Sequence, residues 1–476
     1  MRKNWLVILF IAVFFFASAY KIVRFPTPFY DWDESIYVRS GLEMVNAKSL
    51  VPLWQGRIWL DKPPLIILVY GLITKWSTTT FPPEVSTRLF TLAIAAVVMG
   101  LMYVLYQRVL KNQILSTLVV AITAFTPIFL QRAVTVNLDI FLLLGWLGYI
   151  VFFENFWLSF IFIFIAVMSK SLLGFYPLGI IGAYYLYEFF SKKIGQKKLK
   201  EIFTKLVLQG LLLSIWYVVM LFFFKGRFWE QHIIESHFRR VTSSLEFHFG
   251  DRIYYITLAA AQMGYFFWLA IVGGLAFLIQ FFRKKTKDAT LLVAFYLLPW
   301  FIFLNIVKTK IFWYFYPAAA EFAFLSIAWV SLVKKKSLVI IFGVLIVAGL
   351  FYQDFVVTNV WNANYSKPES YYYLSLYARS ECPEIELLMD KDSRQSFATL
   401  DKLGLSITTT KWWGSHPSMI YYFGKKINFY YHVADFTPVL NTGKCFVIDK
   451  NDLGLMSNNH LHLLKNFGDF YLYNRK

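Results

Sequence analysis

Residues 31–37 read DWDESIY, and residues 59–65 read WLDKPPL. The first stretch closely follows a hydrophobic segment, residues 5–23, that is long enough to cross a membrane, and the second comes later in the same loop. Charged side chains beside a bilayer are energetically costly and tend to mark a functional site. The two stretches therefore predict a cluster of ionisable groups at the mouth of a membrane helix.

The composition of the chain supports a membrane protein. Of its 476 residues, 58% are hydrophobic and only 16% are charged, whereas a soluble domain is about half apolar and about a quarter charged. The net charge of +19 would suggest nucleic acid in a soluble protein. Because the basic stretches are not interleaved with aromatic residues, we expect membrane lipids as partners and no nucleic acid.

Hydrophobic runs predict an α-helical polytopic membrane protein with about eleven transmembrane helices. The first run is interpreted as an uncleaved helix rather than a signal peptide, because the small residues Ala17–Ala19 are followed by Tyr20 and Lys21. The expected spans are 5–23, 87–107, 113–130, 140–153, 156–169, 171–190, 204–224, 253–282, 289–307, 312–333 and 337–355. Residues 65–76 are apolar but too short to span, so an interfacial or re-entrant helix on the outer surface is expected there.

The basic loops predict the orientation, because loops rich in Lys and Arg stay in the cytoplasm. These loops are Arg2-Lys3, Arg108 to Lys111, KKIGQKKLK (192–200), RKKTK (283–287) and KKK (334–336). The first loop (24–86) and the whole region after residue 356 then lie outside the cytoplasm. We expect a multi-pass protein of the inner (plasma) membrane whose functional site is extracytoplasmic.

The chain divides into a transmembrane domain, residues 1–356, and a small extracytoplasmic α/β domain, residues 357–476. In the second domain, GKCFVID (443–449) and FGDFYLYN (467–474) are typical of strands, and HPSMIYYFG (416–424) and HLHLLKNF (460–467) are typical of helices. Cys382 and Cys445 either pair in an oxidising compartment or remain two free buried thiols.

Nearly all ionisable groups at the outer helix ends can converge on one face. Each group alone can be explained as a side chain that extends to the lipid headgroups. Together, the groups are suited to a site in which a general base lies beside a bound phosphate. Such a site suits the transfer of a group from a lipid phosphate. The groups are Asp31, Asp33, Glu34, Asp61, Lys62, Arg132, Asp139, Lys170, His232, Glu235, His237, Arg239, Arg240, His248, Lys308 and Lys310.

The chain resembles the polyprenyl-phosphate-dependent glycosyltransferases of the GT-C fold. This group, which includes family 39, contains the protein O-mannosyltransferases and the aminoarabinose transferases that modify lipid A. The resemblance rests on four stretches in order, which are DESIYVRSGLEMV (33–45), DKPPLI (61–66), QRAVTVNLD (131–139) and KTKIFWYFYP (308–317). It implies the GT-C fold and a polyprenyl-phosphate-linked sugar donor.

The resemblance also implies roles for individual residues. Asp33 matches the catalytic aspartate, Glu34 its helper, and Asp139 the second acid. The implied donor-phosphate contacts are Lys62, Arg132, Lys308, Lys310 and Tyr314. Thr309 and Phe312 stand where Ser and Pro are common, which leaves the contact lysine open between Lys308 and Lys310. A divalent metal is the one cofactor implied, with Asp61 and His237 as ligands, although Asp61 replaces the usual Glu.

The function expected from these residues is that of an inverting glycosyltransferase. It would move a sugar from a polyprenyl phosphate to lipid A, another glycolipid, a polysaccharide or a protein. One alternative is an enzyme like the O-antigen ligases or polymerases, which carry their main loop late in the chain. Another is a transporter of lipid-linked sugars, whose charges should lie near the middle of the bilayer.

Overall fold

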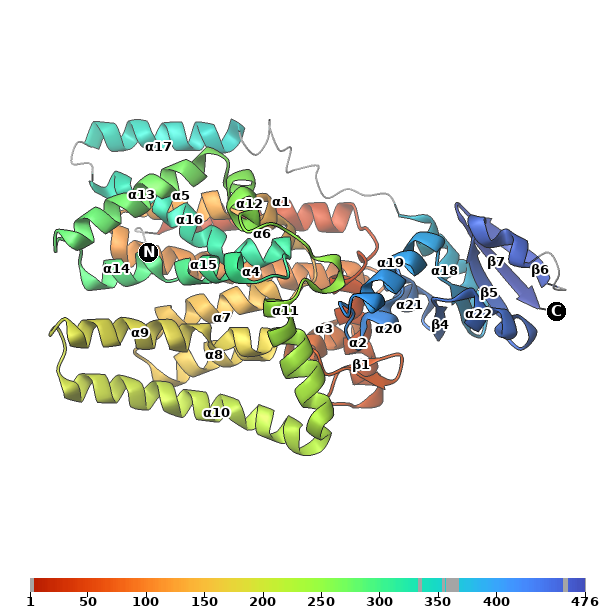
Figure 1. Ribbon diagram of the computed structural model, residues 1–476. Helices are drawn as coiled ribbons and strands as arrows, with labels where there is room; N and C mark the ends of the chain where they lie inside the picture. The colour runs from red at the N-terminus through yellow and green to blue at the C-terminus, as the bar shows by residue number, and fades with distance from the viewer. Residues whose placement is uncertain (1–3, 333–335, 353–355, 357–367, 457–460, 476) are drawn as a thin grey trace.

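The computed structural model describes residues 4–332, 336–352, 356, 368–456 and 461–475. It consists mainly of helices that run alongside one another, with a mixed α/β domain at one end of this bundle (Figure 1). The bundle includes α1 (Trp5–Arg24), α4 (Pro83–Leu110), α5 (Gln113–Phe125), α6 (Pro127–Val134), α7 (Asp139–Val151), α8 (Phe156–Lys170), α9 (Tyr176–Phe190), α10 (Gln196–Phe228), α12 (Tyr254–Met263), α13 (Tyr265–Phe282), α14 (Asp288–Phe295), α15 (Leu298–Ile306), α16 (Tyr316–Ala328) and α17 (Lys336–Phe351).

Six helical segments of the described residues are long and apolar enough to cross a membrane. They are Trp5–Arg24, Pro83–Leu110, Phe156–Phe190, Gln196–Thr242, Tyr265–Phe282 and Asp288–Ile306. The pair α5 and α6, which is bent by 74° at Pro127, raises the count to seven if it forms one span. The chain is therefore a polytopic helical membrane protein, as the hydrophobic runs predict.

The other expected spans are shorter or interrupted helices. Helix α7 is apolar but has 13 residues, and the segment Phe156–Phe190 is interrupted at Ser171, whose φ is +55°. A count of eleven thus includes spans that length and composition alone do not identify. The end of the last expected span (353–355), the boundary at residue 357 and the basic residues Arg2, Lys3, Lys334 and Lys335 lie outside the described residues.

The apolar segment expected as a short surface helix is α3 (Pro64–Lys75), which has 12 residues. It packs along α2 (Asp33–Ala47), at the end of the bundle nearest the α/β domain (Figure 1). The two backbones meet at Gly41 and Gly71, where a Cβ atom on either residue would lie within 2.2 Å of the other helix. Glycine at both positions therefore permits the close packing that fixes α2 against α3.

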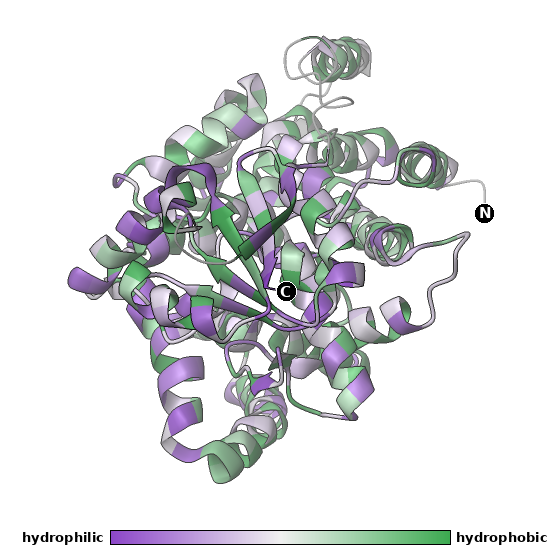
Figure 2. Cartoon of the chain, turned by 90° about the vertical axis from the view of Figure 1, so that its right-hand side faces the viewer, coloured by the Kyte–Doolittle hydropathy of each residue, from purple (hydrophilic) through white to green (hydrophobic). Residues whose placement is uncertain are grey.

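The C-terminal domain contains a five-stranded mixed sheet in the order β4-β3-β5-β7-β6. The central strand β5 (Cys445–Asp449) is parallel to β3 (Ile385–Leu388) and antiparallel to β7 (Phe470–Arg475). Its helices are α18 (Ser370–Glu381), α19 (Lys391–Lys402), α20 (Thr410–Trp413), α21 (Ser418–Phe423) and α22 (Val433–Phe436), and its other strands are β4 (Ile427–Tyr430) and β6 (Leu461–Phe467). Figure 2 shows this domain in front, with more hydrophilic segments than the helices behind it.

One secondary-structure prediction in this domain is wrong. Residues 460–467 are expected as a helix, but residues 461–467 form strand β6, which pairs with β7 across a tight turn at Gly468. Pairing with a neighbouring strand outweighs the local pattern of three leucines. The strands expected within 443–449 and 467–474 and the helix expected within 416–424 are confirmed.

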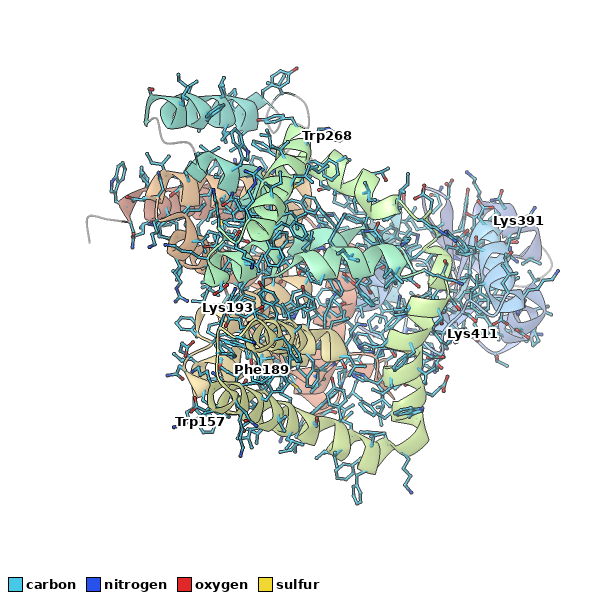
Figure 3. The ribbon with its side chains drawn as sticks, turned by 60° about the vertical axis from the view of Figure 1, so that its left-hand side comes forward. Trp157, Phe189, Lys193, Trp268, Lys391 and Lys411 are labelled. Atoms are coloured by element: carbon cyan, nitrogen blue, oxygen red, sulfur yellow. A yellow bond between two sulfur atoms is a disulfide. The ribbon has the colours of Figure 1, made fainter. Side chains whose placement is uncertain are left out.

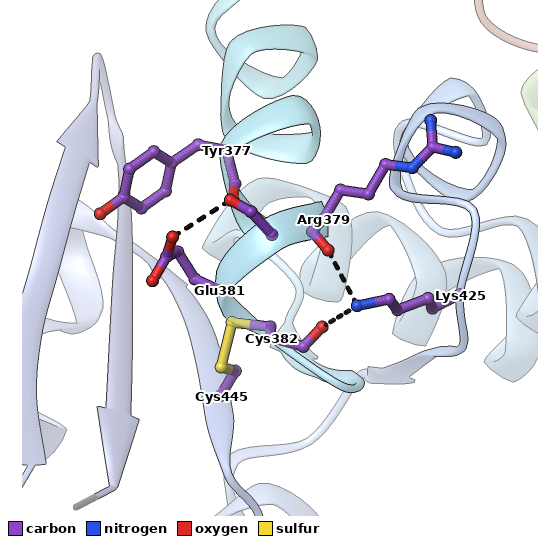
Figure 4. Close-up of a disulfide and its surroundings, with 7 residues drawn as sticks. Tyr377, Arg379, Glu381, Cys382, Lys425 and Cys445 are labelled. Atoms are coloured by element: carbon purple, nitrogen blue, oxygen red, sulfur yellow. Dashed lines mark hydrogen bonds between the residues drawn. A yellow bond between two sulfur atoms is a disulfide. The ribbon is translucent and has the colours of Figure 1, made fainter.

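The two cysteines form a disulfide, Cys382–Cys445, which joins the end of α18 to β5 (Figure 4). Lys425 donates hydrogen bonds to the carbonyl oxygens of Arg379 and Cys382, at 2.8 and 2.7 Å. The end of α18 is therefore attached both to the sheet and to the loop before β4.

Basic connections lie at the end of the bundle away from the C-terminal domain. Figure 3 labels Lys193, between α9 and α10, at that end, and Lys391 and Lys411 in the C-terminal domain at the opposite end. The short elements of the first loop, β1 (Leu53–Trp54), β2 (Arg57–Ile58), α2 and α3, lie beside the C-terminal domain (Figure 1).

Candidate active site

Helix α2 presents Asp33 in its first turn, directly after Trp32, which has a φ of +67°. The Arg132 guanidinium lies 3.3 Å from Asp33 Oδ2, and the Tyr37 hydroxyl donates to Asp33 Oδ1 at 3.2 Å. The Asp33 side chain nevertheless remains 27% exposed. Asp33 is thus a carboxylate that two donors orient and that a substrate can still reach.

The next residue, Glu34, has a different environment. Its side chain is 3% exposed, and it forms a two-point ion pair with Arg88 of α4, with N–O distances of 2.6 and 3.0 Å. The backbone amides of Tyr30 and Val136 also donate to it. These four hydrogen bonds occupy its oxygens, so Glu34 holds α2, α4 and the segment before α7 together.

Asp139 and Lys170 form a second buried ion pair. Asp139 lies in the first turn of α7, and its Oδ1 is 2.5 Å from Lys170 Nζ at the end of α8. The other oxygen, Oδ2, is buried and has no hydrogen-bond partner among the described residues. Burial and the nearby charges of Asp33 and Asp139 raise the pKa of Tyr37, which places both acids beside this phenol.

The Lys62 ammonium group forms no hydrogen bond or ion pair with the described residues. It is half-buried. Burial, with the positive charges of Arg240 and Lys170, lowers the pKa of Lys62 to about 8, and the negative charges of Asp61 and Asp33 oppose this effect. A half-buried ammonium group that lacks a direct partner is well suited to receive an external anion.

The residues of the stretch 308–317 for which the resemblance implies donor contacts lie in different places. We call Asp33, Lys62, Arg132, Asp139 and Lys170 the charged cluster. Tyr314 lies with this cluster, since its ring centre is 4.9 Å from Lys170 Nζ. The Lys310 ammonium instead donates to the carbonyl oxygens of Leu304 and Asn305, both at 3.0 Å, near the end of α15. Lys308 is exposed. The structure thus brings Tyr314 to the cluster, whereas it directs the Lys310 ammonium toward a helix end.

Arg132 lies within the cluster, beside Asp33. Its side chain is 7% exposed, and the guanidinium lies over the Trp313 ring, 4.6 Å from the ring centre. The adjacent stretch 308–317 therefore contributes an aromatic surface that orients Arg132.

The described residues do not fit the divalent-metal site that the resemblance implies. No group of three or more His, Cys, Asp and Glu side chains in the described ranges could hold a metal ion. Asp61 is buried, with Oδ2 accepting a hydrogen bond from Thr409 at 3.1 Å, and His237 Nδ1 is 2.7 Å from the carbonyl oxygen of His232.

Two residues of the set expected to converge, His232 and Arg240, have positions in the structure that the sequence does not assign to them. His232 is fully buried and bridges the carbonyl of Leu60 and the hydroxyl of Ser171, both at 2.6 Å, so it links the segment before Lys62 to the residue after Lys170. Arg240 pairs with Glu246 at 3.0 Å and lies close enough to Lys62 to affect its pKa. The sequence feature that points to both residues is the dense group of His, Glu and Arg side chains at 232–248.

Comparisons with known proteins agree with this architecture. No family model matches the chain, and an uncharacterised protein of Aquifex aeolicus is 24% identical over 372 residues, which cover 74% of this chain and 69% of that protein. The crystal structure of ArnT from Cupriavidus metallidurans bound to undecaprenyl phosphate superposes with a TM-score of 0.67 at 14% identity, over 99% of this chain and 98% of that chain.

An archaeal enzyme has a similar fold. The oligosaccharyltransferase of Archaeoglobus fulgidus gives a TM-score of 0.62 at 12% identity, over 96% of this chain and 71% of that chain. ArnT, a lipid A aminoarabinose transferase, and this oligosaccharyltransferase are glycosyltransferases of the GT-C fold. The chain described here therefore has the GT-C fold, in which Asp33 and its surrounding cations lie where the bundle meets the C-terminal domain.

Proposed function

We propose that this protein is an integral-membrane glycosyltransferase that transfers a sugar from a polyprenyl phosphate to an acceptor outside the cytoplasm. The observation that carries the proposal is the accessible Asp33 carboxylate, oriented by Arg132, close to the unpaired cation Lys62. The complex of ArnT with undecaprenyl phosphate supports a lipid phosphate as the donor.

In this mechanism Asp33 acts as the general base. The acceptor hydroxyl or amine donates a hydrogen bond to the Asp33 carboxylate, which takes the proton as the nucleophile attacks the anomeric carbon. The bond between that carbon and the phosphate oxygen breaks, and the oxygen leaves with the electron pair. A single displacement of this kind inverts the configuration of the sugar. General base catalysis contributes about 10²–10⁴-fold to such a rate.

The cations stabilise the charge that develops on the leaving phosphate. Lys62 is the first candidate because no ion pair with a described residue restrains its ammonium group. Lys170 and Arg132 already bind Asp139 and Asp33, and both lie within the same cluster. Tyr314 supplies a phenol beside Lys170. Fixed charges in a poorly hydrated site stabilise a developing anion more strongly than water does.

The proposed orientation places this site and the C-terminal domain outside the cytoplasm, in the inner membrane. The position of Lys193 at the opposite end of the bundle supports it, because basic loops stay inside. The disulfide Cys382–Cys445 supports it independently, since disulfides persist in oxidising compartments. The proposed acceptor is a glycolipid such as lipid A, a polysaccharide or a protein.

The direct test uses purified protein in vesicles with a polyprenyl phosphate that carries a radiolabelled sugar, and with cell-envelope material as acceptor. We expect label in the acceptor and an equal amount of free polyprenyl phosphate. Vesicles without acceptor are the control. Movement of the intact donor across the bilayer, without cleavage, would instead indicate a transporter and contradict the proposal.

A further inference from the structure

Three consecutive threonines of the C-terminal domain, Thr408–Thr410, each donate a hydrogen bond to a carboxylate of the transmembrane domain. Thr408 donates its backbone amide and its hydroxyl to Glu235, at 3.0–3.1 Å. The Thr409 hydroxyl lies 3.1 Å from Asp61 Oδ2, and the Thr410 hydroxyl 3.3 Å from Glu246 Oε1. We call these residues the threonine triplet.

Each of the three carboxylates also adjoins a cation. Glu246 pairs with Arg240 at 3.0 Å, and Glu235 pairs with Arg239 at 3.7 Å. Asp61 directly precedes Lys62 in the chain and opposes the lowering of its pKa. Each threonine of the triplet therefore contacts one carboxylate, and each carboxylate lies next to one basic residue. These basic residues are Arg239, Lys62 and Arg240.

We propose that the threonine triplet is a positioning element through which the C-terminal domain fixes Lys62 and Arg240 for binding of the donor phosphate. The inference rests on the proposed function and adds a role for the C-terminal domain, which supplies none of the residues named above as the base or as ligands of the donor phosphate. It concerns the geometry of the cations, whereas proton transfer remains the task of Asp33.

Thr409 is the critical member of the triplet. Both Thr409 and Asp61 are buried, at 0% and 5% exposure, and Asp61 Oδ1 has no hydrogen-bond partner among the described residues. Loss of the Thr409 hydroxyl leaves a buried carboxylate poorly satisfied, so its side chain must shift or take up a proton. Because Pro63 and Pro64 restrict the backbone after Lys62, a shift of Asp61 also displaces Lys62.

The experiment measures binding of undecaprenyl phosphate to the purified full-length protein in nanodiscs. Thr409→Val keeps the shape of the side chain and removes the hydroxyl, and Thr409→Ser restores the hydroxyl. Thr399→Val is the matched control, because Thr399 is exposed on α19 and bonds only within its own helix, to Gln395. We expect about tenfold weaker binding for Thr409→Val, with Thr409→Ser and Thr399→Val within about twofold of wild type.

Kinetics distinguish positioning from a general structural role. With a labelled donor, Thr409→Val should raise the donor KM about tenfold and leave kcat within about threefold. In an Asp61→Leu background, which has no oxygen to accept the hydrogen bond from Thr409, Thr409→Val should weaken binding no further, since the two residues act through one hydrogen bond. If Thr409→Val yields too little folded protein, Asp61→Asn, which removes the charge from the other side of that bond, should by itself weaken binding.

The outcomes separate this inference from the proposed function. Unchanged donor binding in Thr409→Val, or equal losses with and without Asp61→Leu, would overturn the positioning role while leaving the enzyme assignment intact. Failure of the wild-type protein to bind undecaprenyl phosphate would overturn the proposed function and the inference with it.

Discussion

The Arg132 guanidinium lies 3.3 Å from Asp33 Oδ2, although the two residues are 99 positions apart in the chain. Arg132 also stacks on Trp313, which holds its guanidinium plane in place. A planar donor that is fixed by an aromatic ring orients a carboxylate more precisely than a flexible ammonium group does. This pair therefore gives Asp33 a defined direction while part of its surface stays accessible.

Replacement of Arg132 should lower turnover without unfolding the protein. We expect Arg132→Lys, which keeps the charge but loses the planar contact, to reduce kcat about tenfold, and Arg132→Gln to reduce it about a hundredfold. The control is Arg394→Gln, which breaks the Arg394–Asp452 pair of the C-terminal domain and should leave kcat unchanged. Turnover of Arg132→Gln within twofold of wild type would contradict the orienting role.

Glu34 should matter for stability rather than for proton transfer. Glu34→Gln leaves the buried Arg88 charge without its partner, and breaking a buried ion pair from one side costs about 3–5 kcal/mol. We expect a lower yield and a lower melting temperature in detergent.

The double variant Glu34→Gln with Arg88→Met removes both charges and should recover part of this loss. If Glu34→Gln melts like the wild type and is inactive, Glu34 acts in the chemistry and our interpretation of the pair is wrong.

The Asp33–Glu34 pair shows which features of the candidate site can be predicted from the sequence alone. The position of both acids after the first membrane helix predicts the candidate site. Successive residues on a helix point in different directions, however, so at most one of them can face the substrate. The choice depends on Arg88, 54 residues further on, and local sequence carries no information about that contact.

Lys310 and strand β6 illustrate the same limit. The resemblance places Lys310 in the stretch 308–317 among the expected donor contacts. In the structure, however, its ammonium group binds the carbonyl oxygens at the end of α15. Residues 461–467 form a strand because β7 lies beside them. Long apolar helices and the strands around Cys445 and Leu472 could be predicted because their patterns are local, whereas pairings between distant segments could not.

Donor use should decline as the pH rises through about 8, because Lys62 loses its proton there. Lys62→Arg keeps its charge to higher pH, so it should extend the alkaline limit of kcat/KM for the donor while binding phosphate with altered geometry. Lys391→Gln, at an exposed site in α19, serves as the control. A wild-type profile that stays flat from pH 7 to pH 10 would exclude Lys62 as the donor ligand.

Deprotonation of Lys62 does not itself destabilise the folded protein. Because the pKa of Lys62 is lower in the folded state than its ordinary value of 10.5, the unfolded chain binds more protons between about pH 8 and that value. The contribution of Lys62 to the free energy of unfolding therefore increases with pH in this window. Melting temperatures measured at each pH provide the check.

Introduced cysteines allow the orientation to be tested in intact cells. Cys382 and Cys445 are buried and paired, so we expect neither to react with a maleimide. Lys411→Cys, at an exposed site in the C-terminal domain, should react with a membrane-impermeant maleimide in intact cells. Gly195→Cys, between α9 and α10, should react only once the membrane is opened. Labelling of residue 195 in intact cells would contradict the proposed orientation.

The central claim, that Asp33 is the catalytic base, is tested most directly by the turnover of purified Asp33→Asn with a radiolabelled polyprenyl-phosphate sugar. We predict an unchanged melting temperature and unchanged binding of undecaprenyl phosphate, with turnover at least about a hundredfold lower than that of the wild type. Turnover within a few-fold of wild type, from an Asp33→Asn protein that binds the lipid normally, would remove Asp33 from the mechanism.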